Sequence, residues 1–538
     1  MRKIAMNRYG SSVLAAFLTV MSGLTPVNAD VRLPGLISDN MLLQTGPATR
    51  IWGWADAGEK VSVTLQGTTV SATADQKGHW QVKVNAKPAA EPMDMTVAGK
   101  NTITIKNVLV GEVWFVAGQS NVWWPVSRTD NADQEIAAAK HPKLRLFAVP
   151  VRAEPKPVDD ITLTYPQTVP EMPQPAVSGK WVECSPEIIG DFSGLAYYFG
   201  RDLHKDLDVP VGIISAGVGG TLVEAWTSES ALQANPDCKW IIDHWTNYKA
   251  NVYPKKLAEH QVELAKWKAS VEAAKANDPN SAEAKAPQPE APIDADRYVN
   301  RCAALYNGMV APLTPFTIKG AAWYQGESNA GKPETYALNL KVMIQDWRKA
   351  WNVGEFPFLI VQLPNVDTSK FPSVGKEWAG MREAQMDAAE LPNTGIVVTI
   401  DLGKADDMHP KNKQDVCRRM ATLAEGMAYD KKVAVSGPVL QSKTISGRTV
   451  KLKFKHAEGG LTSPSSELTG FEVAGADGKY VSAKARIEAD SVIVESDAVD
   501  HPVAVKYAWL DNPTASLFNK AGLPASPFRT DRKTQDAK

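Results

Sequence analysis

Cysteine is scarce in this 538-residue chain, and neither sign of charge dominates. Four cysteines are present, at widely spaced positions, which argues against a zinc knuckle and against a dense disulfide scaffold. One disulfide bridge and four buried thiols are both compatible with this spacing. With 59 basic and 60 acidic residues, the composition gives no indication of a nucleic-acid partner. The cysteines are Cys184, Cys238, Cys302 and Cys417.

Long apolar runs are also missing after residue 29, where no stretch approaches ~18 continuous apolar residues, so no membrane anchor is expected. The first residues differ. Arg2, Lys3 and Arg8 precede an apolar stretch over residues 13–24 and small residues at 27–29. This pattern predicts a cleavable signal peptide over residues 1–29, too short in its apolar part to span a bilayer. We therefore expect an exported protein, periplasmic or secreted.

The remaining chain of about 509 residues exceeds the roughly 250–300 residues that one hydrophobic core supports, so several units are expected. Short alternating runs broken by turn residues predict strands at 61–65, 80–84 and 102–106, and the same texture returns at 449–454, 491–495 and 503–507. These runs predict a β-rich N-terminal domain over residues 30–110 and a β-rich C-terminal segment over 430–538. A different centre lies between them.

The centre, residues 111–429, alternates strand-like apolar runs with helical periodicity, which is typical of an α/β sheet. Strands are predicted at 113–117, 211–215, 321–324, 358–363 and 396–400, and helices at 194–205, 335–351 and 413–428. An insertion over about 254–296 begins as an Ala, Lys and Glu helix and continues as a Pro- and Ala-rich surface loop. The predicted fold class is thus α/β with β-rich ends.

Ser120 follows the apolar run at 113–117 in the sequence Gly118-Gln-Ser-Asn121. The carboxyl end of a strand is where open α/β sheets place their ligands, and a preceding glycine lets the backbone turn sharply. A serine hydroxyl needs a positioned imidazole to accept its proton and a carboxylate to orient that imidazole. By itself this motif is also compatible with an ordinary turn or helix cap.

A base and an acid occur together much later, in Asp406-Asp-Met-His-Pro410. His409 is the best general base among the eight histidines, because it has acid neighbours in a polar loop after a predicted strand. The alternatives are a solvent-exposed loop histidine and a metal ligand. Because Asp-Asp-x-His without a second nearby histidine fits no common zinc spacing, no metal is predicted.

Two further turns carry polar groups at the ends of predicted strands. The glycine pair Gly219-Gly220 follows the strand at 211–215, and its amides are suited to donate to a developing oxyanion. Gln325 and Glu327 follow the strand at 321–324, offering a second oxyanion donor and a carboxylate for sugar hydroxyls or for His409. Each turn alone is also compatible with a plain structural role.

Taken together, the motifs at 118–121, 219–226, 323–329 and 406–410 resemble the sialate O-acetylesterase family of the SGNH hydrolase superfamily. The likeness extends to 192–201, 306–309, 511–513 and 522–529, and so spans essentially the whole mature chain. It implies a three-layer α/β/α core with accessory β-rich domains. It also implies O-acetyl ester hydrolysis on a glycan or small sugar, with no cofactor.

The resemblance assigns Ser120 as nucleophile, His409 as base and Asp406 as acid, with Asp407 and Glu327 as alternative acids. Oxyanion donors would be the amides of Ser120 and Gly220 and the side chain of Gln325, while Asn121 is a further candidate for substrate binding. Family members often have methionine and an acidic residue after the Gly-Gln-Ser-Asn motif, where this chain has Val122, Trp123 and Trp124. We expect the two indoles to stack on sugar faces.

The sequence therefore predicts a carbohydrate O-acetylesterase, with sialic acids as the first substrate class and acetylated xylan or another polysaccharide as the alternative. A non-catalytic sugar-binding protein is the rival of another class, although a pure binder has no need of a nucleophile beside a base. A lipase or peptidase is disfavoured, because Gly-x-Ser-x-Gly is absent at Ser120.

Overall fold

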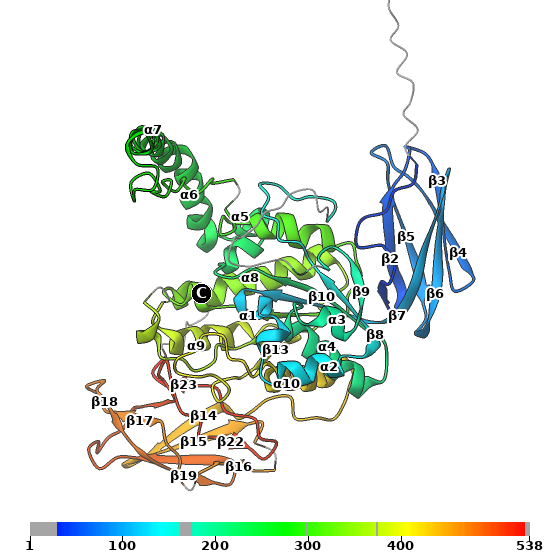
Figure 1. Ribbon diagram of the computed structural model, residues 1–538. Helices are drawn as coiled ribbons and strands as arrows, with labels where there is room; N and C mark the ends of the chain where they lie inside the picture. The colour runs from blue at the N-terminus through cyan, green and yellow to red at the C-terminus, as the bar shows by residue number, and fades with distance from the viewer. Residues whose placement is uncertain are drawn as a thin grey trace, which may run out of the picture.

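The computed structural model describes residues 30–161, 175, 177–296, 298–372, 375–457, 459–465 and 467–532. The predicted signal peptide, residues 1–29, lies outside the described residues. Figure 1 shows a central α/β body with one β-rich unit beside it, a second below it and a helical arm projecting at the upper left. None of the helices in the described part is both long and apolar enough to cross a membrane.

A parallel sheet forms the centre of the molecule. Its strand order is β13-β12-β11-β7-β10-β8-β9, parallel throughout except for β9, which runs antiparallel to β8. The five strands predicted for the centre all occur, whereas β8 and β9 were not predicted. The bounds are β7 (Thr102–Gly118), β8 (His141–Ala148), β9 (Trp181–Cys184), β10 (Val211–Gly217), β11 (Gly320–Tyr324), β12 (Phe358–Val361) and β13 (Thr394–Val397).

Over residues 113–117, the side chains of β7 alternate between two hydrophobic clusters, as the two-residue period of a strand requires. Phe115 packs in the cluster that contains residues of α8 (Pro333–Trp351) and α9 (Trp378–Ala388), whereas Trp114 packs with residues of α4 (Gly194–Leu207) and α10 (Lys413–Ala428). The helices predicted at 194–205, 335–351 and 413–428 are α4, α8 and α10. Helix α9 was not predicted, since buried Arg382 and Gln385 interrupt its apolar periodicity.

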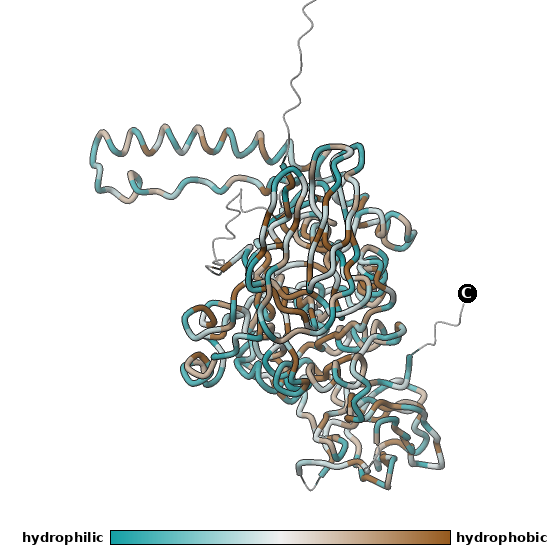
Figure 2. The backbone as a smooth tube through the Cα atoms, turned by 90° about the vertical axis from the view of Figure 1, so that its right-hand side faces the viewer, coloured by the Kyte–Doolittle hydropathy of each residue, from teal (hydrophilic) through white to brown (hydrophobic). Residues whose placement is uncertain are grey.

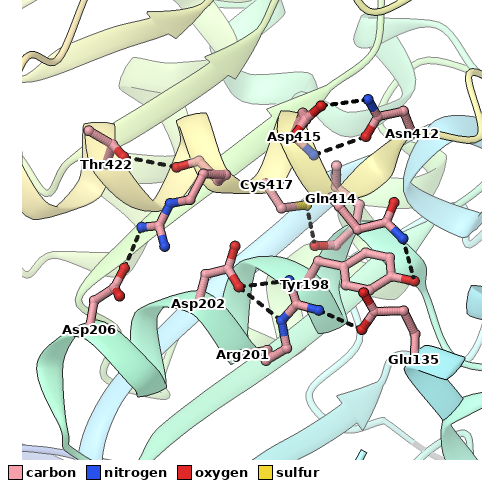
Figure 3. A network of polar contacts seen from close by, with 12 residues as sticks. Glu135, Tyr198, Arg201, Asp202, Asp206, Asn412, Gln414, Asp415, Cys417 and Thr422 are labelled. Atoms are coloured by element: carbon pink, nitrogen blue, oxygen red, sulfur yellow. Dashed lines mark hydrogen bonds and ion pairs between the residues drawn. The ribbon is translucent and has the colours of Figure 1, made fainter. Parts of the chain in front are cut away.

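Polar contacts join α4 to α10, the helix that follows the loop of His409 (Figure 3). Gln414 on α10 donates to the Tyr198 hydroxyl on α4 at 3.3 Å, and the Cys417 thiol donates to the Leu195 carbonyl. Arg201 on α4 bonds Asp202 in the same helix and Glu135 on α2 (Ala132–Ala138). At the start of α10, the Asn412 side chain accepts from the amide of Asp415. These contacts fix where α10 begins, four residues after His409. Another short helix nearby is α3 (Pro186–Ile189).

The N-terminal β-rich unit is continuous with the central sheet. Strand β7 pairs antiparallel with β6 over its first half and parallel with β10 and β11 over its second half. The predicted boundary between residues 110 and 111 therefore falls inside one strand. The other strands are β1 (Leu42–Gln44), β2 (Gly46–Trp54), β3 (Lys60–Leu65), β4 (Thr68–Thr73), β5 (His79–Ala86) and β6 (Ala89–Ala98).

The C-terminal β-rich unit contains two four-stranded sheets, β14-β15-β20-β19 and β18-β17-β21-β23, and the small pair β16-β22. Its hydrophobic cluster includes Val398 and Ile400, which precede the predicted boundary at 430. The strands are β14 (Val439–Ser446), β15 (Thr449–Lys455), β16 (Leu461–Thr462), β17 (Phe471–Ala474), β18 (Tyr480–Ser482), β19 (Lys484–Glu488), β20 (Ser491–Glu495), β21 (Ala504–Tyr507), β22 (Phe518–Asn519) and β23 (Phe528–Arg529).

The arm visible in Figure 2 contains the predicted insertion. Helices α5 (Glu229–Ala234) and α6 (Lys239–Asn247) lead into α7 (Tyr253–Asn277), and the chain returns along α7 in turns over residues 278–296. The Trp267 indole donates to the Ala286 carbonyl, 3.0 Å away, and holds the return segment.

The four cysteines are free and buried. Of the two possibilities left open by the sequence, the structure has four buried thiols and no disulfide bridge among them.

Candidate active site

Three parallel strands end together where the serine motif begins. Gly118, the last residue of β7, lies opposite Gly217 of β10 and Tyr324 of β11. A Cβ on Gly118 would lie 2.1 Å from the Tyr324 carbonyl oxygen, and the backbone has φ of +150° there, so only glycine fits. The chain then enters the short helix α1 (Ser120–Trp123), which places the serine at the carboxyl edge of the sheet.

Ser120 and His409 are brought together from positions 289 residues apart. The Nε2 atom of His409 lies 2.9 Å from the Ser120 hydroxyl oxygen, a distance suited to direct proton transfer. Because Ser120 is the first residue of α1, its own amide has no acceptor inside the helix and is available to a ligand oxygen. Both side chains are half-buried, so the pair is sheltered and still accessible.

The imidazole of His409 stacks on an indole. The ring of Trp124 lies parallel to it, with centroids 4.6 Å apart and an interplanar angle of 11°. The indole is itself fixed, since its Nε1 donates to the Arg128 carbonyl at 3.1 Å. One face of Trp124 is thus occupied by the histidine, where the sequence predicted a sugar. Trp123 is half-buried beside it.

The loop that carries His409 is held by side chains on either side of the histidine. Asn121 Nδ2 donates to the Met408 carbonyl at 3.1 Å, and Lys413 Nζ donates to the Pro410 carbonyl at 2.5 Å. Lys413 also donates to Asn121 Oδ1 at 2.8 Å, which links the two clamps. Asn121 is fully buried, and its side-chain amide bonds the histidine loop on one side and Lys413 on the other.

Glu327 belongs to the same buried network. Its Oε1 accepts a hydrogen bond of 2.7 Å from Asn121, while its Oε2 is buried without a hydrogen-bond partner among the described residues. Burial raises the pKa of this carboxyl above its ordinary value, opposed by the Asn121 bond and the Lys413 charge. The structure therefore places Glu327 beneath the site, as the partner of Asn121.

The two aspartates of the histidine loop differ in position. Asp406 is exposed, whereas Asp407 is half-buried and its Oδ1 accepts from the backbone amide of His409 at 2.8 Å. Among the hydrogen bonds between described residues, neither carboxylate accepts one from the imidazole ring of His409. The structure thus brings the base to the nucleophile without placing Asp406 on the imidazole.

Burial and nearby cations keep the imidazole neutral. Burial, together with the charges of Lys413 and Arg128 and against the opposing charge of Asp407, lowers the pKa of His409 to about 4. Burial likewise lowers the pKa of Lys413 to about 8. At neutral pH the histidine is therefore in the form that accepts a proton.

The predicted oxyanion donors are placed unequally. Gly220 has φ of +69°, and a Cβ at this position would meet no atom within 4 Å. Its amide donates in none of the hydrogen bonds between described residues. The amide group of Gln325 is fully engaged, because Nε2 donates to the Thr221 carbonyl at 2.9 Å and to Asn329 Oδ1 at 2.7 Å. The Gln325 side chain joins two turns, and neither N–H of its amide group is left for an oxyanion.

Sequence reasoning did not find Lys413 or Glu224 as part of the site. Glu224 is a buried carboxylate that accepts from Asn329 and Asn339, each at 3.1 Å, beneath the turn that begins at Gln325. A signal for Lys413 exists in the sequence. A lysine in the first turn of a helix opposes the helix dipole, which favours acidic residues there.

A serine hydroxyl beside a neutral imidazole at the carboxyl edge of a parallel sheet is the arrangement of an α/β hydrolytic enzyme. The family model described as carbohydrate esterase, sialic acid-specific acetylesterase, matches residues 294–425. The sialate O-acetylesterase of Mus musculus is 27% identical, covering 92% of this chain and 94% of its own length. That of Homo sapiens is 28% identical over 76% of this chain and 73% of its own length.

A solved structure extends the likeness to the whole fold. The crystal structure of a carbohydrate acetylesterase from Xanthomonas citri is 31% identical, with a TM-score of 0.75, over 94% of this chain and 100% of that chain. The chain belongs to this carbohydrate esterase family, and it is an ester hydrolase.

Proposed function

We propose that the chain removes O-acetyl groups from carbohydrates by a two-step reaction with Ser120 as nucleophile and His409 as general base. The observation that carries this proposal is the 2.9 Å contact between His409 Nε2 and the Ser120 hydroxyl at the edge of the sheet. Support also comes from the neutral state of the imidazole, whose pKa burial lowers to about 4. A non-catalytic sugar binder has no use for such a pair.

In the first step, His409 accepts the Ser120 proton while the serine oxygen attacks the acetyl carbonyl carbon. The tetrahedral oxyanion receives hydrogen bonds from the amides of Ser120 and Gly220. When this intermediate collapses, the imidazolium returns the proton to the departing sugar oxygen, leaving an acetyl ester on Ser120. In the second step water attacks the carbonyl carbon of that ester and His409 accepts its proton. When this second tetrahedral intermediate collapses, the imidazolium returns the proton to the Ser120 oxygen, and acetic acid leaves.

The acid of this mechanism is assigned to Asp407. Its charge is the carboxylate contribution that raises the pKa of His409, and its Oδ1 fixes the histidine backbone. The negative charge stabilises the imidazolium that forms in each step. Asp406, the acid that the Asp-x-x-His pattern predicts, is solvent-exposed and is the competing assignment. Stacking on Trp124 supplies the ring orientation that a carboxylate bond to Nδ1 provides in other serine hydrolases.

The fold and location that go with this function are an SGNH-hydrolase-like core and an exported protein. The two hydrophobic clusters on opposite faces of the central sheet support a three-layer α/β/α arrangement, with the β-rich ends as accessory units. The charged and apolar pattern of residues 1–29 supports export to the periplasm or the medium.

Sialic acids are the proposed first substrate class, because relatives that align over most of the chain are named sialate O-acetylesterases. The Xanthomonas citri structure, which has higher identity, is described more broadly as a carbohydrate acetylesterase, and this favours acetylated polysaccharide as the second class. The two classes differ in whether the site must admit a single acidic sugar or a chain of neutral ones.

The test is acetate release by the mature protein from O-acetylated sialic acid and, in parallel, from acetylated xylan. Ser120→Ala is expected to lower turnover by roughly 10⁴-fold or more with little change in melting temperature, because it removes only the nucleophile. Release from one substrate alone would name the sugar class. If Ser120→Ala kept wild-type turnover, or if the folded wild type released acetate from neither substrate, the mechanism or the substrate assignment would be abandoned.

A further inference from the structure

We infer that the C-terminal β-rich unit holds the His409 loop in its active position, with Asp511 and Arg382 as the positioning residues that transmit this support. The inference rests on the proposed roles of Ser120 and His409. It gives a catalytic purpose to a unit whose described residues 430–457, 459–465 and 467–532 include none of the site residues above. Three sets of contacts carry it, and together they connect the C-terminal unit to the loop that bears His409.

The first contact is hydrophobic. After β13 the chain passes through Val398 and Ile400, which are 8% and 1% exposed and belong to the hydrophobic cluster of the C-terminal unit. Their neighbours in that cluster include Leu452, Val494 and Leu517. The segment that leads into the histidine loop is therefore built into the core of the C-terminal unit.

The second contact is polar and centred on Asp511 of the C-terminal unit. Its Oδ1 accepts from the amide of Trp378 at 3.0 Å, its Oδ2 accepts from the Thr368 hydroxyl at 2.5 Å, and its carbonyl accepts from the amide of Val366 at 3.1 Å. One residue thereby fixes both ends of the segment from 366 to 378. This segment lies between β12 and α9 in the catalytic body.

Arg382 on α9 joins the same two regions. Its guanidinium is fully buried and donates to four carbonyl oxygens, those of Leu363 and Pro364 in the catalytic body and those of Leu510 and Asp511 in the C-terminal unit. A planar fork with five donors suits this geometry, and lysine would satisfy fewer of the carbonyls. Arg382 thus ties the C-terminal unit to the catalytic body through four hydrogen bonds.

The third contact passes the support to the histidine loop. Asn365 Oδ1 accepts from the amide of Gly403 at 2.9 Å, and the amide of Asp367 donates to the Ala405 carbonyl at 3.0 Å. Asn365 also donates to Asn512 Oδ1 at 3.0 Å, next to Asp511. Gly403 and Ala405 lie six and four residues before His409. The C-terminal unit therefore supports the start of the loop, at Gly403 and Ala405, whereas Asn121 and Lys413 hold it next to His409.

This arrangement has a kinetic consequence. A displacement of about 1 Å between nucleophile and base costs on the order of 100-fold in rate, whereas the serine, its amide and the strand ends stay in place. Loosening the support should therefore lower kcat and leave KM nearly unchanged. It should also admit water to the imidazole, which moves the acidic limb of the pH–rate profile toward higher pH.

The experiment compares Asp511→Ala, Asp511→Asn and Thr368→Val with the wild type in the full mature chain. Thr422→Val is the matched control, because it removes one hydroxyl whose bond, to the Arg418 carbonyl, lies within α10 and belongs to none of the three sets of contacts. The measurements are kcat and KM for acetate release, the pH profile, and the rate at which a p-nitrophenyl alkylphosphonate labels Ser120. Melting temperature and circular dichroism report folding.

Asp511→Ala is expected to lower kcat and the labelling rate by roughly 10- to 100-fold with KM within about twofold. Asp511→Asn should restore part of the loss, since its amide oxygen accepts one of the two bonds, and Thr368→Val should lose about threefold to tenfold. Thr422→Val should match the wild type. Should Asp511→Ala fail to fold, Thr368→Val and the partial rescue decide the outcome.

Wild-type kcat, labelling rate and pH profile in a folded Asp511→Ala or Thr368→Val variant would overturn the inference. A loss that only follows the unfolded fraction, with an unmoved pH profile, would do the same. Ser120→Ala separates this failure from failure of the proposed function. If that variant is inactive while the Asp511 variants are unaffected, the mechanism stands without C-terminal support; if it is active, the mechanism itself is wrong.

Discussion

The nucleophile and the base are held in opposite ways. Ser120 follows a buried strand whose two parallel neighbours end at the same level, so the backbone of three strands fixes it. His409 lies in a loop that has no strand pairing to hold it. Side chains from distant parts of the chain fix its position instead. The serine position is set by the fold, whereas the histidine position is set by particular side chains.

This difference determines which substitutions should be tolerated around each residue. On the serine side, the backbones of Gly118 and Tyr324 lie so close together that there is no room for one added methyl group. On the histidine side, the supports are separate side chains, and the loss of any one should reduce activity only in part.

Gly118→Ala should be the most damaging change on the serine side. The new Cβ would lie 2.1 Å from the Tyr324 carbonyl oxygen, and φ of +150° is unfavourable for alanine. We expect activity to fall more than about 100-fold and the free energy of unfolding to drop by roughly 2–5 kcal/mol. Acetate release and urea unfolding measure these effects. Gly331→Ala, where a Cβ meets no atom within 4 Å, is the control. A fully active Gly118→Ala enzyme would contradict the strand-based account.

Lys413→Met should come next, because it removes one loop clamp and a buried charge. Asn121 Oδ1 and the Pro410 carbonyl lose their donor, so kcat should fall roughly 10- to 100-fold. The charge of Lys413 helps to depress the pKa of His409, which burial lowers to about 4. Without that charge the imidazolium is favoured, the pKa rises toward its ordinary value of about 6.5, and the acidic limb of kcat/KM moves to higher pH.

The control for this prediction is Lys411→Met, an exposed lysine two residues earlier in the chain. It removes the same charge from the surface and should leave both kcat and the acidic limb in place, because exposed charges are screened. An acidic limb near pH 4 in both variants would show that Lys413 does not set the state of the imidazole.

Trp124→Leu should have a smaller effect on the same loop. It removes the ring that stacks on His409 at 4.6 Å while keeping an apolar side chain in place. A stacked pair contributes about 0.5–1.5 kcal/mol, so kcat should fall about threefold to tenfold with little loss of stability. Trp240→Leu, on the exposed part of the arm, is the matched control. A change in KM alone would instead favour the sugar-stacking role expected from the sequence.

The contrast also explains what the sequence could reveal. Strands β7, β10, β11, β12 and β13 and helices α4, α8 and α10 follow from hydrophobic period, and Ser120 follows from a glycine turn after a buried strand. The meeting of Ser120 with His409 over 289 residues was reached from chemistry and family resemblance. The stacking of Trp124, the engagement of Gln325 and the burial of Lys413 depend on tertiary contacts between distant segments, and no local pattern contains them.

The two loop aspartates give the smallest and most discriminating prediction. Asp407 fixes the His409 amide and raises the pKa of the imidazole, so Asp407→Asn should weaken the base and lower kcat about threefold to tenfold. Asp406 is exposed, and a charge in water is screened, so Asp406→Asn should change kcat less than about twofold. Steady-state kinetics on both variants decide between them. If Asp406→Asn were the more damaging, the loop would have to rearrange when substrate binds, and the acid of the mechanism would be Asp406.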